Sequence, residues 1–299
     1  MRLKRPETEF DMLIAEPLSP MLGANITGID LRNFVDGPDG QIHEIQSLVA
    51  RYKVLRFRGQ QLEAGDLVQL AGRFGPVRAL RRPNSGGVVH IPEHPQIKVV
   101  SNVSRDGAVL GDGDSSELSW HTDGSYLLTP TALTFLYGRK APTRRPPKTS
   151  FMDLQAVYES LPKALADFIL PLKAIHYSVF AYAPEYAEEI RSLPEGADRR
   201  HIGPTHPLVR RDHATGRPSL FPPRQRECLI EGLSAEESEK LSNVLWSVIE
   251  RYPGYWGDSI EPGDLMLFDN RFSLHRREPF DALEERILWH VTTDGERPQ

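Results

Sequence analysis

The stretch Leu265-Met266-Leu267-Phe268-Asp269-Asn270-Arg271-Phe272-Ser273-Leu274-His275 decides how the rest of this sequence is interpreted. Four apolar residues are followed by three polar ones, which is the pattern of a buried strand that ends in a turn. A histidine follows shortly after the turn. The stretch therefore predicts a strand whose far side presents His275 at a buried interior, where an imidazole can bind a metal ion.

A second strand is predicted a short distance further along, in Arg286-Ile287-Leu288-Trp289-His290-Val291-Thr292. Side chains alternate along a strand, so Arg286, Leu288 and His290 share one face. If His275 points into the interior, this strand brings a guanidinium beside it. A buried arginine needs an anion. A dicarboxylate cosubstrate would supply one through a bidentate ion pair, and an internal Asp or Glu is the alternative.

A third feature is the motif Trp120-His121-Thr122-Asp123. In an extended segment His121 and Asp123 point to the same side and can offer two ligands to one metal ion. So short a motif also occurs by chance, and when it stands alone a surface turn or a satisfied histidine is the preferred explanation. Tertiary folding that adds His275 would give two imidazoles and one carboxylate. That combination is the facial triad of non-haem Fe(II) oxygenases.

Composition limits the class of partner. The chain has 299 residues, 39% of them hydrophobic and 26% charged, with a formal net charge of −5. This is ordinary for a globular protein. The densest basic run, Arg144-Arg145 with Lys148, is too short to bind nucleic acid. We therefore expect a small-molecule substrate and no nucleic-acid partner, while a homo-oligomer remains open.

The single cysteine and the apolar pattern indicate the compartment. Cys228 has no partner for an internal disulfide, which fits a reducing environment. The N-terminus lacks the apolar core of a signal peptide. No segment approaches the roughly 20 apolar residues of a membrane span. We expect a cytoplasmic protein that does not bind membranes.

The order of the predicted elements indicates an α+β fold. We find no internal repeat or linker, so residues 1–299 are expected to form a single domain. Many short strands are combined with fewer helices, which favours a jelly-roll core with helices packed outside. Loop-rich stretches at 78–118 and 176–201 are expected to border an active site. Helices are predicted at 40–52, 63–74, 154–170 with a break near Leu161-Pro162, and 235–251 with Ser234 as its cap.

These residues resemble a known family. The segment 120–126, the segment Asp269-Asn270-Arg271 with His275-Arg276, and the trailing Arg286 look like the TauD/TfdA (taurine dioxygenase-like) family of Fe(II)/2-oxoglutarate-dependent dioxygenases. Further markers occur in the family's order, namely residues 22–31, Arg73-Phe74-Gly75-Pro76, residues 206–210 and Thr215-Gly216-Arg217. The similarity spans about residues 15–295.

The resemblance implies a double-stranded β-helix (jelly-roll) core with flanking helices. It implies that His121, Asp123 and His275 bind Fe(II) and that Arg286 grips the distal carboxylate of 2-oxoglutarate. Thr149 matches the family's threonine that helps to hold that carboxylate, although the glycine-rich lead-in is replaced here by Arg-Arg-Pro-Pro-Lys. O2 is the second cosubstrate.

The implied reaction is oxidation, by hydroxylation, of a C–H bond of a small organic substrate, with release of succinate and CO2. Asp123 favours hydroxylation or desaturation over halogenation, because the related halogenases lack the carboxylate ligand. Three alternatives remain at this point. They are desaturation, epimerisation or another rearrangement in natural-product biosynthesis, a metal-dependent hydrolase or isomerase on the same barrel, and a non-catalytic binding protein.

The sequence also departs from taurine dioxygenase at two anion-binding positions. The arginine that binds the substrate sulfonate there, four residues after the cosubstrate arginine, is replaced by His290. A histidine that assists it aligns with Leu80. We therefore expect a substrate other than taurine. Asn102, Gly124 and Tyr126 are further candidates for the substrate pocket.

Overall fold

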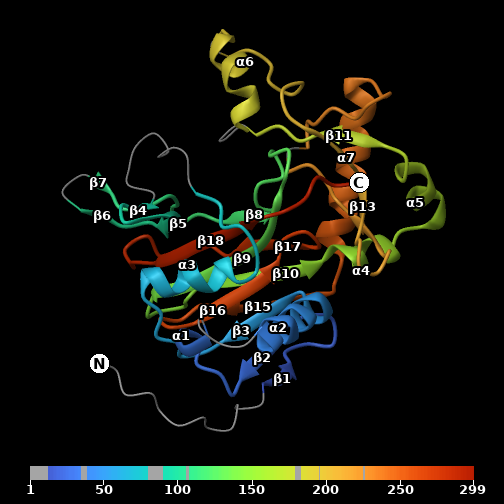
Figure 1. Ribbon diagram of the computed structural model, residues 1–299. Helices are drawn as coiled ribbons and strands as arrows, with labels where there is room; N and C mark the ends of the chain where they lie inside the picture. The colour runs from blue at the N-terminus through green and yellow to red at the C-terminus, as the bar shows by residue number, and fades with distance from the viewer. Residues whose placement is uncertain are drawn as a thin grey trace, which may run out of the picture.

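The computed structural model describes residues 13–34, 39–79, 90–105, 108–178, 183–194, 196–224 and 226–299. Two β-sheets form its centre (Figure 1). The larger contains β1 (Ile14–Pro17), β2 (Ala24–Thr27), β3 (Val54–Phe57), β4 (His90–Ile91), β5 (His94–Ser101), β9 (Thr131–Lys140), β16 (Leu265–Asp269) and β18 (Ile287–Asp294), in the order β1-β2-β3-β16-β9-β18-β5-β4. The smaller contains β8 (Leu118–His121), β10 (Lys148–Asp153), β15 (Tyr255–Ser259) and β17 (Ser273–Arg277), in the order β15-β10-β17-β8. All their pairings are antiparallel except β2 with β3.

The alternation of side chains in β16 shows how the larger sheet is buried on both faces. Leu265 and Leu267 pack into a cluster with the N-terminal helices. Met266 and Phe268 point the other way and pack with Phe151 of the smaller sheet. Each apolar side chain buried in this way contributes roughly 1.5–3 kcal/mol. The run of four apolar residues at 265–268 is thus part of a central strand with no solvent-exposed face.

Helices cover the outer faces of the two sheets (Figure 1). The helix Ala235–Arg251 (α7) begins at the predicted Ser234 cap, which forms a capping box with Glu237. The predicted break near Leu161-Pro162 separates the helix Leu154–Glu159 (α4) from the helix Lys163–Ile169 (α5). The helices against the larger sheet are α1 (Leu31–Phe34), α2 (Asp39–Tyr52) and α3 (Ala64–Gly72). Those against the smaller sheet are α4 (Leu154–Glu159), α5 (Lys163–Ile169) and α7 (Ala235–Arg251). The predicted jelly-roll core with flanking helices is confirmed.

Some elements differ from the prediction. The segment 206–210, a single stretch among the family markers, is divided between β12 (Thr205–Pro207) and β13 (Val209–Arg211), which pair with different partners. The predicted loop 176–201 contains a 3-10 turn (Pro184–Tyr186) and α6 (Ala187–Ser192). The loop-rich stretch 78–118 contains β4, the whole of β5, and the hairpin of β6 (Ser104–Arg105) and β7 (Ala108–Val109). None of the helices in the described ranges has the length and apolar character needed to cross a bilayer.

The smaller sheet determines which side chains face the interior. Leu274 and Met152 pack outward with α4 and α7. The residues that alternate with Leu274, among them His275 and Arg277, must therefore face the larger sheet. The ring of Phe268 lies 4.9 Å from that of His275, which confirms this direction.

Candidate metal centre

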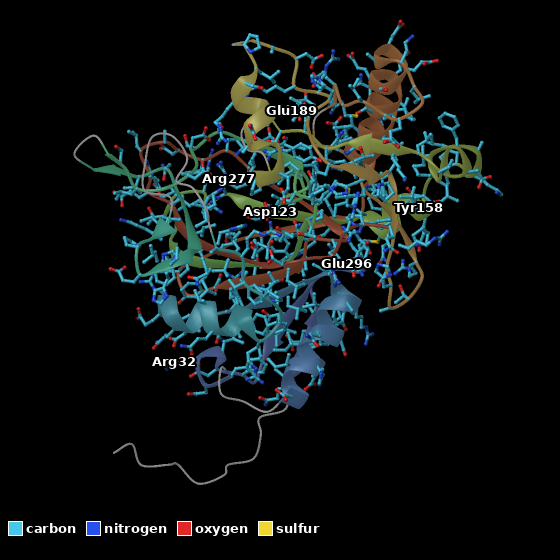
Figure 2. The ribbon with its side chains drawn as sticks, turned by 45° about the horizontal axis from the view of Figure 1, so that its top comes forward. Arg32, Asp123, Tyr158, Glu189, Arg277 and Glu296 are labelled. Carbon is cyan, nitrogen blue, oxygen red and sulfur yellow. The ribbon has the colours of Figure 1, made fainter. Side chains whose placement is uncertain are left out.

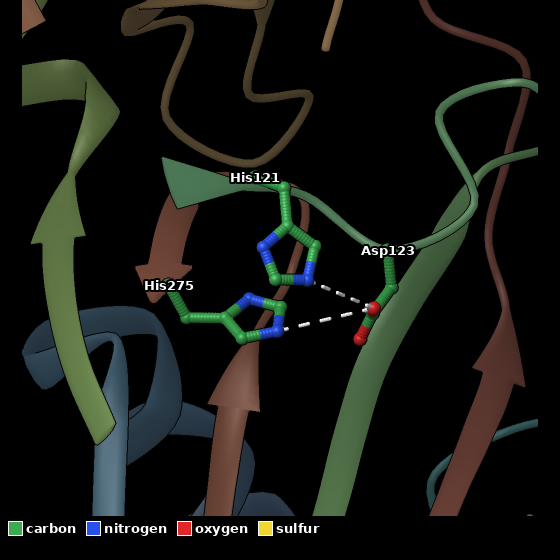
Figure 3. A group of neighbouring side chains, drawn as sticks. All are labelled: His121, Asp123 and His275. Atoms are coloured by element: carbon green, nitrogen blue, oxygen red, sulfur yellow. Dashed lines mark ion pairs between the residues drawn. The ribbon is translucent and has the colours of Figure 1, made fainter. Parts of the chain in front are cut away.

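His121, Asp123 and His275 converge between the two sheets (Figure 3). Figure 2 shows where Asp123 lies within the molecule. β8 and β17 are neighbours, and their register sets His121 opposite His275, with ring centroids 4.1 Å apart. Asp123 lies in the turn after β8. The Nε2 atoms of His121 and His275 are 3.8 Å and 3.9 Å from Asp123 Oδ1. One ligand atom from each residue lies within 4.8 Å of the others, a spacing that suits a single metal ion.

Further hydrogen bonds orient these three side chains. His121 Nδ1 lies 2.8 Å from the carbonyl oxygen of Ser119. This bond places the ring proton on Nδ1 and leaves the Nε2 lone pair for a metal. Asp123 Oδ2 accepts from Thr134 Oγ1 at 3.2 Å and lies 3.1 Å from His290 Nε2. The other carboxylate oxygen, Oδ1, is left facing the two imidazoles.

Burial and charge set the protonation that metal binding requires. Burial lowers the pKa of His121 and of His275, and the neighbouring His275 lowers that of His121 further. Burial opposes ionisation of Asp123, but the interaction with His275 and the hydrogen bond with His290 outweigh it, so the pKa of Asp123 lies well below its ordinary value. Two neutral imidazoles and one carboxylate form the donor set that Fe(II) takes in facial triads.

A second group on the inner surface has the character of an anion site. Arg286 is 6% exposed, and burial lowers its pKa to about 9, with the charge of Arg277 acting in the same direction. No carboxylate of the described ranges pairs with its guanidinium. The buried Thr149 Oγ1 has no hydrogen-bond partner there either, and Thr149 faces Arg277 in the ladder of β10 and β17. Buried polar groups of this kind require a partner, so the residues fit a carboxylate ligand.

The residues predicted for the substrate pocket differ in what their side chains and backbone contact. The side-chain amide of Asn102 forms hydrogen bonds with the backbone of Glu284 and of Arg286. Gly124 has φ +65°, and a Cβ there would lie 2.9 Å from Thr131 Oγ1, so it is required for the turn. Both residues support the backbone, and a contact with substrate stays a prediction for each.

The other three candidates for the substrate pocket are Tyr126, His290 and Leu80. Burial raises the pKa of Tyr126, and so does the charge of Asp123, which places this phenol near the metal centre. Tyr126 also borders a small pocket together with His176 and Tyr177. His290 lies against Asp123, as described above. Leu80 falls outside the described residues.

Three residues near the centre were not identified from the sequence. Asn270 Oδ1 accepts from the backbone N–H of Asp123 at 2.8 Å, and its Nδ2 donates to the carbonyl of the same residue at 2.9 Å. Arg277 lies two residues after His275, so strand alternation could have placed it on the inner face. Arg224, in the loop after β14 (Pro218–Leu220), exerts its charge on Asp123 and both histidines; no motif marks it.

A jelly roll with two histidines and a carboxylate on its inner surface is typical of non-haem iron oxygenases. The family model described as "Taurine catabolism dioxygenase TauD, TfdA family" matches residues 15–292. The pentalenolactone F synthase of Streptomyces arenae is 29% identical over 92% of this chain and 91% of its own length. The 2,4-dichlorophenoxyacetate dioxygenase of Cupriavidus pinatubonensis is 28% identical over 94% and 97%. A solved structure of a putative α-ketoglutarate-dependent taurine dioxygenase from Burkholderia xenovorans has a TM-score of 0.73, 25% identity, and coverage of 96% and 91%.

The chain belongs to the TauD/TfdA family. It is a non-haem Fe(II)- and 2-oxoglutarate-dependent dioxygenase, as the sequence predicted. This assignment removes the hydrolase and the binding protein from the alternatives.

Proposed function

We propose that this chain hydroxylates a C–H bond of a small organic substrate other than taurine while it converts 2-oxoglutarate and O2 into succinate and CO2. Residues 1–299 act as one catalytic domain. Fe(II) is held by His121 Nε2, His275 Nε2 and Asp123 Oδ1, and the distal carboxylate of 2-oxoglutarate by Arg286 and Thr149. The observation that carries this proposal lies on the inner surface that also carries the three ligands. Among the described residues, the buried guanidinium of Arg286 has no carboxylate partner and the buried hydroxyl of Thr149 has no hydrogen-bond partner.

The residues of the site have separate roles in the proposed reaction. When bound, Fe(II) supplies the coordination of the keto acid and the activation of O2. Arg286 forms the ion pair that orients the cosubstrate, and the Thr149 hydroxyl donates a hydrogen bond to the same carboxylate. Phe151 and Phe268 pack beside His275 with ring centroids 6.3 Å and 4.9 Å away, and they exclude water from that side of the centre.

The proposed exclusion of taurine is supported by the position of His290. The side chain that replaces the sulfonate-binding arginine lies against Asp123 Oδ2 and supports the carboxylate. Its imidazole is shorter than an arginine and carries no permanent charge. We expect no efficient release of sulfite from taurine, measured in steady-state assays with 2-oxoglutarate. Efficient release would contradict this part of the proposal.

The central test is an anaerobic titration of Fe(II) and 2-oxoglutarate, followed by the weak visible charge-transfer band of the complex. His275→Ala should abolish iron binding. Arg286→Ala should keep iron binding but raise the Kd for 2-oxoglutarate by about 100-fold, because removal of one member of a buried ion pair costs roughly 3 kcal/mol.

Arg139 offers a matched control for Arg286. It is an exposed arginine on the neighbouring strand β9, with its guanidinium 4.2 Å from the ring centroid of Trp289. Arg139→Ala should leave the Kd for 2-oxoglutarate unchanged. A normal Kd in Arg286→Ala would refute the role assigned to this residue.

A further inference from the structure

The side chain of Asn102 continues the pairing of two strands beyond their ends. β5 ends at Ser101 and β18 begins at Ile287, and these two residues are opposite each other in the antiparallel ladder. The next pair along would be Asn102 and Arg286. Asn102 Oδ1 accepts a hydrogen bond from the backbone N–H of Arg286 at 2.9 Å, and Asn102 Nδ2 donates to the carbonyl of Glu284 at 2.9 Å. One amide thus binds the chain on both sides of residue 285.

The same segment is held from the outer side by the carboxylate of Glu284. This carboxylate accepts from the backbone N–H groups of Thr143 and Arg144 and from Arg144 Nε at 2.8 Å. The hydrogen bonds from Arg144 lower the pKa of Glu284 to about 2, so it is ionised throughout the neutral range. The chain therefore enters β18 between the side-chain amide of Asn102 on the inner side and the ion pair of Glu284 with Arg144 on the outer side. We call these two contacts the bracket.

This bracket bears directly on the guanidinium of Arg286. Arg286 is the residue whose backbone N–H donates to Asn102, and no carboxylate of the described chain holds the far end of its side chain. An arginine has considerable rotamer freedom, so its preferred direction depends on where its backbone is fixed. Without Asn102, the buried N–H of Arg286 would lose its partner and the entry to β18 would shift.

We propose that Asn102 is a positioning residue for Arg286, assisted by Glu284, and that it sets the reach of the guanidinium toward 2-oxoglutarate. This inference rests on the proposed function of Arg286. It gives Asn102 a task in cosubstrate binding rather than in contact with the substrate. A purely structural strand cap would affect stability alone, whereas a positioning residue also changes the affinity for 2-oxoglutarate.

The test compares Asn102→Leu with Ser101→Ala in the full chain loaded with Mn(II). Ser101 Oγ accepts from the N–H of Val103 at 2.9 Å, so the control also removes a side-chain hydrogen bond at the end of β5. Calorimetry should show that Asn102→Leu raises the Kd for 2-oxoglutarate about tenfold, with an unchanged Kd for Mn(II). Ser101→Ala should bind 2-oxoglutarate like wild type even where its melting temperature falls.

A double-mutant cycle separates positioning from general loss of stability. If Asn102 acts through Arg286, adding Asn102→Leu to Arg286→Ala should not weaken 2-oxoglutarate binding further. Equal effects of Asn102→Leu in both backgrounds, or an Asn102→Leu protein with the wild-type Kd, would overturn the inference. A normal Kd in Arg286→Ala would instead refute the proposed function, and the inference with it.

A second variant covers the case in which Asn102→Leu does not fold. Glu284→Gln alters the solvent-facing half of the bracket and removes the charge that Arg144 pairs with. It should raise the Kd for 2-oxoglutarate about threefold and leave the Kd for Mn(II) unchanged, because a neutral amide keeps only part of the bonding. A wild-type Kd for 2-oxoglutarate in Glu284→Gln would contradict the bracket as described.

Discussion

His290 Nε2 lies 3.1 Å from Asp123 Oδ2, on the carboxylate oxygen that does not face the other two histidines. The Nε2 atoms of His121 and His275 approach Oδ1 instead. Thr134 Oγ1 adds a second contact to Oδ2 at 3.2 Å. The two oxygens of one carboxylate thus have separate tasks, and the hydrogen bonds to Oδ2 fix the rotation that presents Oδ1 to a metal.

Removal of His290 should weaken iron binding. His290→Leu deprives Asp123 Oδ2 of its closer partner, so the carboxylate can rotate away from the imidazoles. We expect the Kd for Fe(II) to rise about 10- to 100-fold, as is typical when a partner of a metal ligand is lost. Anaerobic Fe(II) titration measures this. Thr134→Val removes the longer contact and should have a smaller effect in the same direction. An unchanged Kd in His290→Leu would show that His290 serves another purpose.

Asn270 should matter for stability as well as for the metal. Its side chain binds the N–H and C=O of Asp123 and the C=O of Thr131, and it is 2% exposed. Asn270→Ala removes the partner of three backbone groups, one buried and two partly buried, so the free energy of unfolding should fall by about 3 kcal/mol. Denaturant titration measures the fall. Asn33→Ala, which removes an exposed amide that bonds to Asp30, is the control and should change it by less than about 0.5 kcal/mol.

Thr149 should show opposite effects on stability and on cosubstrate binding. Thr149→Val replaces a buried hydroxyl, which has no hydrogen-bond partner in the described part of the chain, by a methyl group of similar size. The free protein should gain about 1 kcal/mol in its free energy of unfolding, because an unpaired buried polar group is removed. The Kd for 2-oxoglutarate should nevertheless rise about fivefold. A variant that binds 2-oxoglutarate normally would exclude Thr149 from that site.

The sequence indicated which side chains come together better than it indicated the elements that carry them. The structure brings His121, Asp123 and His275 together as the sequence predicted, while their role as Fe(II) ligands stays a prediction. The strands β10, β15 and β17 were not predicted as elements, because short strands that lie between two layers lack a clear alternating pattern. α2 and α7 were predicted correctly, since each has one buried stripe.

The surroundings of the site were harder to predict for a physical reason. Asn102 and Asn270 act through hydrogen bonds to backbone groups far away in sequence, and no local pattern marks such a contact. Arg224 reaches the centre from the loop after β14, whose path depends on tertiary packing. His290 was expected to reduce anion binding, but only the folded chain reveals its contact with Asp123.

Two buried histidines away from the metal predict how stability depends on pH. His176 and His206 are each 1% exposed, and both ring nitrogens of His176 lack a hydrogen-bond partner among the described residues. Burial lowers the pKa of both rings, that of His206 to about 4. An unfolded chain takes up these protons near pH 6.5, before the folded chain does. The free energy of unfolding should therefore be highest above pH 6.5 and fall as the pH drops toward 4, by at most about 1.4 kcal/mol per pH unit for each histidine.

His176→Phe tests this dependence. The ring of His176 stacks on Phe221 with centroids 4.6 Å apart, so a phenyl group fits the same contact and cannot be protonated. Urea unfolding at pH 7 and pH 5 should show a smaller loss of stability on acidification than in wild type. At pH 7 the variant should be as stable as wild type or about 1 kcal/mol more stable, because two unpaired buried nitrogens are gone. His43→Phe, at an exposed position of α2, is the control and should keep the wild-type loss. If His176→Phe loses as much stability between pH 7 and pH 5 as the control does, the buried ring is not the source of the acid sensitivity.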